Sequence, residues 1–149
     1  MDARTTTFDG AGALLVARAV LEVLAPGVTA IGGPTQGADP IGVAVALVGS
    51  TDGRVLKAFS VRKEAKGHGT GGRVVGPVGP GDRAAVVEDT TTTGGSLLGA
   101  IDALGEEGIP VVQALTLVDR SGGLVAGLMA SRGIPYLALV VPADLGLEP

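Results

Sequence analysis

Apolar residues in this chain fall into two alternating patterns, stretches with helical spacing and short continuous runs. Over residues 13–24 they recur every three or four positions, which predicts an amphipathic helix that ends before Pro26. The same spacing predicts helices over 96–107 and 124–132, while 40–48 is apolar nearly all round, as expected of a buried helix or strand. The short runs predict strands at 28–31, 55–61, 84–87, 111–118 and 137–141.

Helical stretches that alternate with short apolar runs are typical of an α/β fold, in which helices cover both faces of a parallel sheet. The chain shows no internal repeat and no linker, so we expect one domain over residues 1–149. In such a sheet, ligands bind beyond the carboxyl ends of the strands. The chemistry is therefore expected where predicted strands run into Gly32-Gly33, Glu88-Asp89 and Asp119-Arg120.

The segment 62–83 interrupts this pattern. It contains seven glycines and little sign of a buried helix, which in a compact domain is typical of a functional lid or a disordered connection. Five basic residues against two acidic ones give the segment a charge of +3, whereas the rest of the chain carries −7, for a net charge of −4. This local positive charge predicts a flexible clamp for an anion.

Composition excludes several classes of function. The chain has no cysteine and one histidine, which excludes disulfide scaffolds, thiol catalysis, cysteine-ligated zinc and a metal site built from several histidines. Aromatic residues make up 2% of the chain and the net charge is −4, so binding to nucleic acid or to an anionic membrane is not expected. No apolar run approaches the length that spans a bilayer, and we expect a cytoplasmic protein.

The strongest motif covers residues 84–96, where an apolar strand leads into two acids, four threonines, two glycines and a serine. Glycine N–H groups, hydroxyls and the start of a helix together favour a bound phosphate. Carboxylates would repel that phosphate, so Glu88 and Asp89 are expected to accept hydrogen bonds from sugar hydroxyls or to help hold a metal ion. The implied ligand is a sugar phosphate. A Walker loop is excluded, because no lysine follows a glycine and precedes Ser or Thr.

Two segments resemble a known family. Residues 86–96 resemble the signature of type I phosphoribosyltransferases, which bind 5-phosphoribosyl 1-diphosphate, and residues 59–69 resemble the catalytic loop of the orotate phosphoribosyltransferases. The resemblance continues through 31–40, 117–120 and 143–147 and covers about four fifths of the chain. It implies a Rossmann-like central parallel sheet flanked by helices, with a long flexible catalytic loop and a reduced or absent hood.

The resemblance also implies roles for individual residues. Glu88 and Asp89 would contact the ribose hydroxyls, and Arg120 would meet the carboxylate of orotate. The 5-phosphate would be held by Thr92, Thr93, Gly94, Gly95 and Ser96. The loop that closes over the diphosphate would carry Arg62, Lys63, Lys66 and His68. The expected catalytic residues are Lys63, Lys66, His68 and Asp89, with Mg²⁺ as the cofactor and no side chain assigned as a metal ligand.

These roles imply a pentosyltransferase of pyrimidine nucleotide biosynthesis that moves the phosphoribosyl group from the donor to orotate. The resemblance implies a homodimer in which each loop reaches into the partner's site. Two other functions stay open: transfer to a purine or another base, and a catalytically weak regulator that binds the same donor. Asp119 and Arg120 could also form no more than an ion pair at the end of a strand.

Two features depart from the family pattern. Residues 32–37 should contact the diphosphate but include no Lys or Arg, so backbone N–H groups and Gln36 would have to serve instead. The family's N-terminal aromatic-rich motif ends in Asp-x-Arg, and only Asp2-Ala3-Arg4 resembles that ending. We interpret the chain as truncated, as having a misplaced start, or as a divergent relative without the hood that helps to bind the base.

Overall fold

The structure, a computed structural model, describes residues 2–67 and 71–147. Its centre is a six-stranded sheet in the order β3-β2-β1-β4-β5-β6. All neighbouring strands are parallel except β2 and β3, which are antiparallel. The strands are β1 (Ala30–Pro34), β2 (Lys57–Val61), β3 (Val74–Val75), β4 (Ala84–Thr91), β5 (Val111–Asp119) and β6 (Tyr136–Val140).

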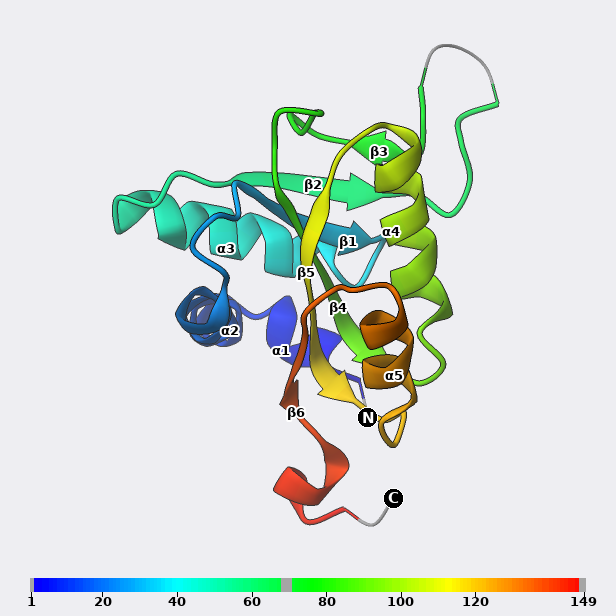
Figure 1. Ribbon diagram of the computed structural model, residues 1–149. Helices are drawn as coiled ribbons and strands as arrows, with labels where there is room; N and C mark the ends of the chain where they lie inside the picture. The colour runs from blue at the N-terminus through cyan, green and yellow to red at the C-terminus, as the bar shows by residue number, and fades with distance from the viewer. Residues whose placement is uncertain (1, 68–70, 148–149) are drawn as a thin grey trace.

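Helices cover both faces of this sheet (Figure 1), which confirms the predicted α/β fold. α2 and α3 pack on one face, and α4 and α5 on the other. The helices are α1 (Arg4–Thr7), α2 (Gly10–Val23), α3 (Asp39–Thr51), α4 (Gly95–Glu106) and α5 (Leu124–Ser131), followed by the 3-10 helix η1 (Pro142–Leu145). None of the described helices is long and apolar enough to cross a membrane.

The side chains of β4 explain why both faces are covered. Ala85 and Val87 belong to a core with α2 and α3, whereas Ala84 and Val86 belong to a second core with α4 and α5. All four are fully buried. Because successive side chains of a strand point to opposite faces, an unbroken apolar run is what a strand buried on both faces requires.

Several element boundaries differ from the predictions. β4 continues to Thr91 because it stays paired with the long strand β5, so Glu88 and Asp89 lie inside the strand rather than after it. Residues 40–48, for which helix and strand were both possible, belong to α3, with Pro40 in its first turn. The acids are therefore held by sheet hydrogen bonds and not by a loop.

The predicted flexible loop over 62–83 is wrong in its second half, which is bound to the sheet. The N–H of Arg62 donates to the carbonyl of Arg73 at 2.8 Å, and Nε of Arg73 donates back to the carbonyl of Arg62 at 2.9 Å. The chain then adds β3 to the edge of the sheet. Near its end, the buried carboxylate of Asp82 accepts hydrogen bonds from Nζ of Lys57 and Oγ1 of Thr29, each at 2.9 Å.

Candidate active site

Two acidic residues near the end of β4 form the floor of the candidate site. Oδ1 of Asp89 accepts a hydrogen bond from the N–H of Thr90 at 2.9 Å, which fixes the orientation of this carboxylate. Glu88 is partly buried, and burial, together with the neighbouring Asp89 carboxylate, raises its pKa to about 7. Near neutral pH, Glu88 therefore exchanges its proton easily, and a hydrogen-bond donor placed against it would favour the charged form.

The loop between β1 and α3 forms one wall beside these acids. Its peptide bond between Thr35 and Gln36 is cis. Oγ1 of Thr35 donates to Oδ2 of Asp39 at 2.7 Å and lies 2.8 Å from Oγ of Ser60, which ties the loop to α3 and β2. At Gly37 a Cβ atom would lie 2.3 Å from Oδ1 of Asp89, so only glycine lets the loop approach this closely.

The acids and this loop face one cavity of about 370 Å³. The N-terminal residues Asp2 to Arg4 and the start of α4 complete its walls. Four residues of the predicted site line this cavity: Lys63, Glu88, Asp89 and Ser96. A second cavity of about 250 Å³ shares part of this wall and adds Arg62, Arg73 and Gly95. Together the two spaces are lined by acids and by four cations, Arg4, Arg62, Lys63 and Arg73, which suits a ligand with a sugar and several phosphate groups.

The predicted phosphate site lies at the turn from β4 into α4. Gly94 adopts a left-handed conformation with φ of 78°, and α4 begins at the next residue. No side chain within the described part of the protein caps this helix, so its first N–H groups are available to an anion. Thr92 and Thr93 are exposed in the same turn, and Ser96 faces the cavity.

The basic loop residues lie at different distances from the site. Arg62 and Lys63 line the cavities, and Arg62 is held in place by its backbone bond to Arg73. Lys66 is exposed and lines neither cavity. The predicted role of His68 falls outside the described residues. Of the predicted basic loop residues, Arg62 and Lys63 thus lie at the cavities beside the acids.

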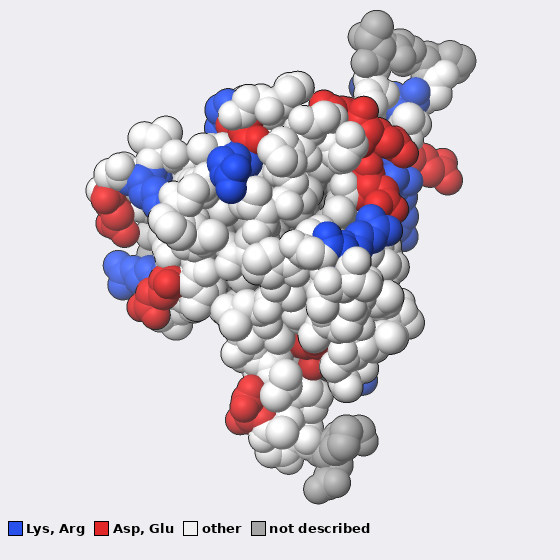
Figure 2. Space-filling model, viewed as in Figure 1, with Lys and Arg blue, Asp and Glu red and all other residues white. Residues whose placement is uncertain are grey.

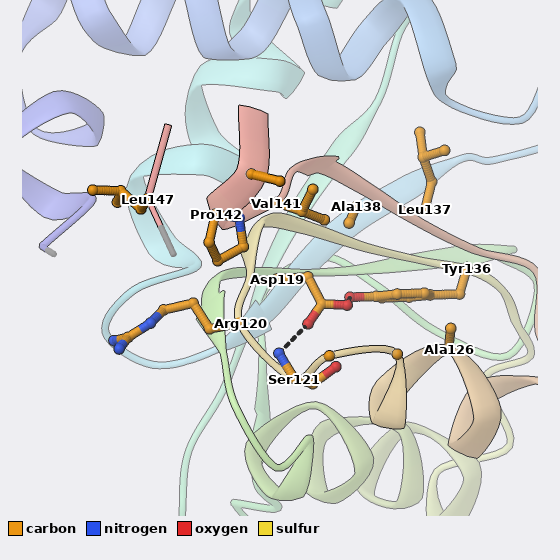
Figure 3. A pocket seen from close by; sticks show the side chains of 13 residues that line it. Asp119, Arg120, Ser121, Ala126, Tyr136, Leu137, Ala138, Val141, Pro142 and Leu147 are labelled. Atoms are coloured by element: carbon orange, nitrogen blue, oxygen red, sulfur yellow. Dashed lines mark hydrogen bonds between the residues drawn. The ribbon is translucent and has the colours of Figure 1, made fainter. Parts of the chain in front are cut away.

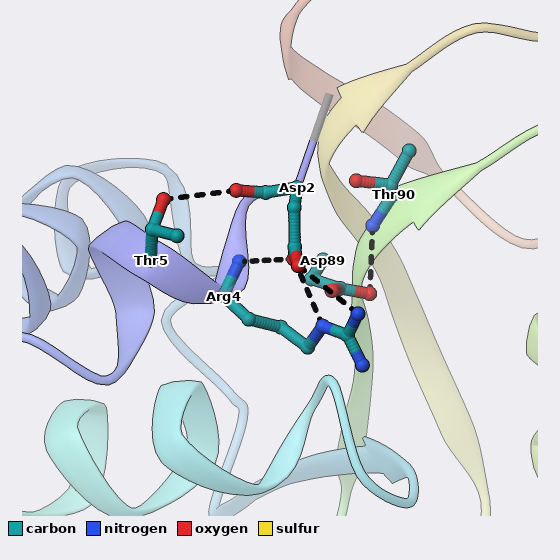
Figure 4. A network of polar contacts seen from close by, with 5 residues as sticks. All are labelled: Asp2, Arg4, Thr5, Asp89 and Thr90. Carbon is teal, nitrogen blue, oxygen red and sulfur yellow. Dashed lines mark hydrogen bonds and ion pairs between the residues drawn. The ribbon is translucent and has the colours of Figure 1, made fainter.

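Sequence reasoning left two N-terminal residues out of the site. Asp2 and Arg4 line the same cavity as Asp89, and Figure 4 shows the Arg4 guanidinium next to the Asp89 carboxylate. Nε of Arg4 also forms an ion pair with Asp2 at 2.8 Å, and this hydrogen bond raises the pKa of Arg4. The resemblance of residues 2–4 to the family's Asp-x-Arg ending was the signal that could have placed them there.

Arg120 lies at a different pocket, of about 780 Å³, between the end of β5, α5, β6 and the C-terminal segment. The backbone N–H of Arg120 donates to the carbonyl of Thr91 at 2.9 Å, so this pocket adjoins the end of β4. Its walls are mostly apolar, with Leu137, Val141 and Leu147 among them (Figure 3). On the face shown in Figure 2, the surface around β6 and α5 is mostly uncharged, with a small acidic patch in it. An arginine beside an apolar wall suits a flat ring that carries a carboxylate.

The alternative of an ion pair between Asp119 and Arg120 is wrong. The Asp119 carboxylate accepts hydrogen bonds from the hydroxyl of Tyr136 at 2.9 Å and from the N–H of Ser121 at 2.7 Å. Within the described residues, the ion pairs involve other acids. Figure 3 shows the Arg120 side chain pointing away from Tyr136, so its guanidinium is open to a ligand.

Comparisons with known proteins agree on one family of relatives. No protein-family model matches the chain. An orotate phosphoribosyltransferase of Streptomyces avermitilis is 44% identical over 149 residues, which cover 99% of this chain and 82% of the relative. A phosphoribosyltransferase structure from Corynebacterium diphtheriae matches with a TM-score of 0.87 and 42% identity, over 99% of this chain and 84% of that one. The orotate phosphoribosyltransferase of Mycobacterium tuberculosis in complex with 5-phospho-alpha-D-ribosyl 1-diphosphate matches with a TM-score of 0.84 and 36% identity, over 98% and 82%.

Proposed function

The chain belongs to the orotate phosphoribosyltransferase family, and from this premise we propose that it transfers the 5-phosphoribosyl group of 5-phosphoribosyl 1-diphosphate to orotate. The products are orotidine 5′-phosphate and diphosphate. One observation carries the proposal: a single cavity joins the acids of β4, the start of α4 and the loop cation Lys63. This is the set of groups that a phosphorylated sugar with a diphosphate leaving group requires.

The donor is expected to lie along this cavity. Its 5-phosphate would accept hydrogen bonds from the N–H groups at the start of α4, and its ribose hydroxyls would donate to Glu88 and Asp89. The diphosphate would then face the β1–α3 loop, with Lys63 on the opposite wall. Because only the ionised form of Glu88 accepts at both oxygens, the bound donor would bring the pKa of Glu88 down from its value near 7.

In the transfer, the bond between the anomeric carbon and the diphosphate oxygen breaks while a ring nitrogen of orotate attacks that carbon. Positive charge develops on the ribose and negative charge on the leaving diphosphate. Carboxylates at Glu88 and Asp89 would stabilise the former, and the cations Arg62 and Lys63 the latter. Lys66, with its neighbour His68, would complete the cationic side when the loop closes, and closure would keep water from the reactive sugar.

The residues at this site fit Mg²⁺ that arrives with the donor. The described part of the protein contains no group of three or more side chains arranged to hold a metal ion. The carboxylates of Glu88 and Asp89 face one cavity, and Mg²⁺ commonly binds through one or two carboxylates together with substrate phosphates. Bound in this way, the ion would neutralise charge on the diphosphate. Glu88 and Asp89 are therefore the residues we propose to help hold it.

Arg120 is the residue we propose to select the base. Its guanidinium can form two parallel hydrogen bonds with a carboxylate, and orotate carries one whereas common purine bases do not. Its backbone bond to Thr91 places it beside the turn that would hold the 5-phosphate. The acceptor base would thus lie between the apolar pocket and the anomeric carbon.

Loss of orotate absorbance in the presence of donor and Mg²⁺ tests the proposal directly. Consumption of orotate, with formation of orotidine 5′-phosphate, is the expected result. A panel that includes adenine, guanine and uracil distinguishes the acceptors in the same assay. Turnover of one of these bases without turnover of orotate would refute the proposed substrate, and donor binding without any turnover would refute the proposed activity.

We also propose a homodimer in which the loop around Lys66 serves the partner's site. Lys66 is exposed and lines neither of the two cavities described above, which is consistent with a loop that acts elsewhere. Mixing inactive Lys66→Ala with inactive Asp89→Asn should restore activity, because a mixed dimer then contains one intact site. At random mixing, about a quarter of the sites would be intact. If light scattering shows a dimer and the mixture remains inactive, the loop serves its own chain.

A further inference from the structure

Asp119 is a buried carboxylate at the end of β5 whose charge is not balanced by an ion pair among the described residues. Its exposed fraction is 6%. Its two hydrogen bonds come from the hydroxyl of Tyr136 at 2.9 Å and from the N–H of Ser121 at 2.7 Å. A buried charge without a cation is costly unless such bonds satisfy it. Packing of the sheet alone does not require a carboxylate at this position, which points to what its hydrogen bonds hold in place.

The two bonds to Asp119 fix the backbone on either side of Arg120. Ser121, which follows Arg120, is bound to Asp119 through its N–H, and its Oγ accepts the N–H of Val125 at the start of α5 at 3.1 Å. Arg120 itself donates its N–H to the carbonyl of Thr91 at 2.9 Å. The turn from which the guanidinium extends is therefore held by β4, by α5 and by the Asp119 carboxylate.

Tyr136 binds this carboxylate from the neighbouring strand β6. It lies at the start of β6, where it is paired with Ala114, and its ring reaches along the sheet to Asp119 at the end of β5 (Figure 3). Burial raises the pKa of Tyr136, and the nearby carboxylates of Asp119 and Glu88 raise it as well. The hydroxyl therefore stays protonated and donates to Asp119 across the pH range in which enzymes work.

We propose that Tyr136 is a positioning residue for substrate recognition: through the Asp119 carboxylate, its hydroxyl fixes the turn from which Arg120 meets the carboxylate of orotate. This inference rests on the proposed function, because it needs orotate as the acceptor. The ring of Tyr136 lines the Arg120 pocket, but its hydroxyl is bound to Asp119 and Arg120 extends away from it, so the hydroxyl acts on Arg120 through Asp119.

Tyr136→Phe tests the proposal, since it removes the hydroxyl and keeps the ring. The expected result is a rise in the KM for orotate of roughly tenfold, the usual effect of losing a hydrogen bond to a charged group, with kcat and the KM for the donor within about twofold. In an Arg120→Ala background, Tyr136→Phe should cause no further rise, because the two residues act on one contact.

Leu139→Ala is the matched control on the same strand. Leu139 packs against the core on the α2 and α3 face and does not line the Arg120 pocket, so its truncation should lower the melting temperature without changing the KM for orotate. A structural role of Tyr136 would give the same result as this control, or would raise the KM for orotate equally with and without Arg120. Either outcome would overturn the positioning role.

The same experiments separate this inference from the proposed function. If the wild-type protein consumes orotate and Arg120→Ala raises the KM for orotate, the assignment of Arg120 holds. An unchanged KM for orotate in Tyr136→Phe then refutes the role of Tyr136 and leaves the role of Arg120 standing. If Arg120→Ala leaves the KM for orotate unchanged, the proposed role of Arg120 fails, and the role of Tyr136 fails with it.

Discussion

Gly37→Ala is the substitution whose effect on the site can be worked out most directly. The added Cβ would lie 2.3 Å from Oδ1 and 2.5 Å from Cγ of Asp89. Ordinary contacts between such atoms are longer by at least about 1 Å, so either the β1–α3 loop or the Asp89 carboxylate must move by that amount. The carboxylate is the end of a short side chain, and it would rotate away and lose its bond to the N–H of Thr90. The Asp89 carboxylate and the β1–α3 loop could then no longer both take the positions that we propose for binding the donor.

A displacement of about 1 Å at a reacting centre can lower the rate about a hundredfold, which corresponds to about 2.7 kcal/mol of transition-state stabilisation. We therefore expect kcat/KM for the donor to fall about a hundredfold in Gly37→Ala, with the unfolding free energy changed by less than about 1 kcal/mol because the cavity is open to solvent. Initial rates over a grid of donor and orotate concentrations measure the first quantity, and urea unfolding the second.

The control for this experiment is Gly105→Ala on α4, where an added Cβ meets nothing within 4 Å. This variant should keep wild-type kinetics and gain about 0.5–1 kcal/mol of stability, since alanine favours a helix over glycine. A folded Gly37→Ala protein with kcat/KM within threefold of the wild type would refute the reasoning. In that case, the close approach of the loop to Asp89 has no part in catalysis.

Three further predictions concern the acids and the loop. Lys66→Ala should lower kcat by at least about a hundredfold while leaving the melting temperature unchanged, because Lys66 is exposed and its proposed role concerns only the leaving group. Steady-state rates check the first part and thermal unfolding the second. Because burial raises the pKa of Glu88 from 4.5 to about 7, its protonated form stabilises the free protein below pH 4.5, and this contribution is lost as the pH rises through 7. The unfolding free energy of Glu88→Gln relative to the wild type should therefore increase from pH 5 to pH 8, by at most about 3 kcal/mol, in urea unfolding without ligand. The same difference between the two proteins at pH 5 and at pH 8 would contradict this. Asp82→Ala removes the acceptor for Lys57, Thr29 and the N–H of Gly79 and should cost about 2–4 kcal/mol of unfolding free energy, with kinetics preserved at low temperature.

The sheet was predictable because its central strands β1, β4 and β5 are buried on both faces. A short apolar run such as Ala84–Val87 suits a strand buried on both faces, and glycine or proline ends several of the runs. Periodicity could not predict where β4 ends, because Glu88 and Asp89 interrupt the apolar run while pairing with β5 continues to Thr91. For the same reason β3 was missed: two residues of an edge strand give no pattern.

The change from strand to helix at residues 90–96 was predictable because all its groups are adjacent in the sequence; that this segment binds a phosphate stays a prediction. Contacts between distant segments gave no such signal. Tyr136 binds Asp119 across 17 residues only because β6 pairs with β5 in a register that lets the ring reach the end of the sheet. A sequence pattern records which residues a strand carries but not this register, so the partner of a buried carboxylate becomes known only with the fold. The residue next to it in the sequence, Arg120, thus forms no ion pair with Asp119, as its proposed role in binding orotate requires.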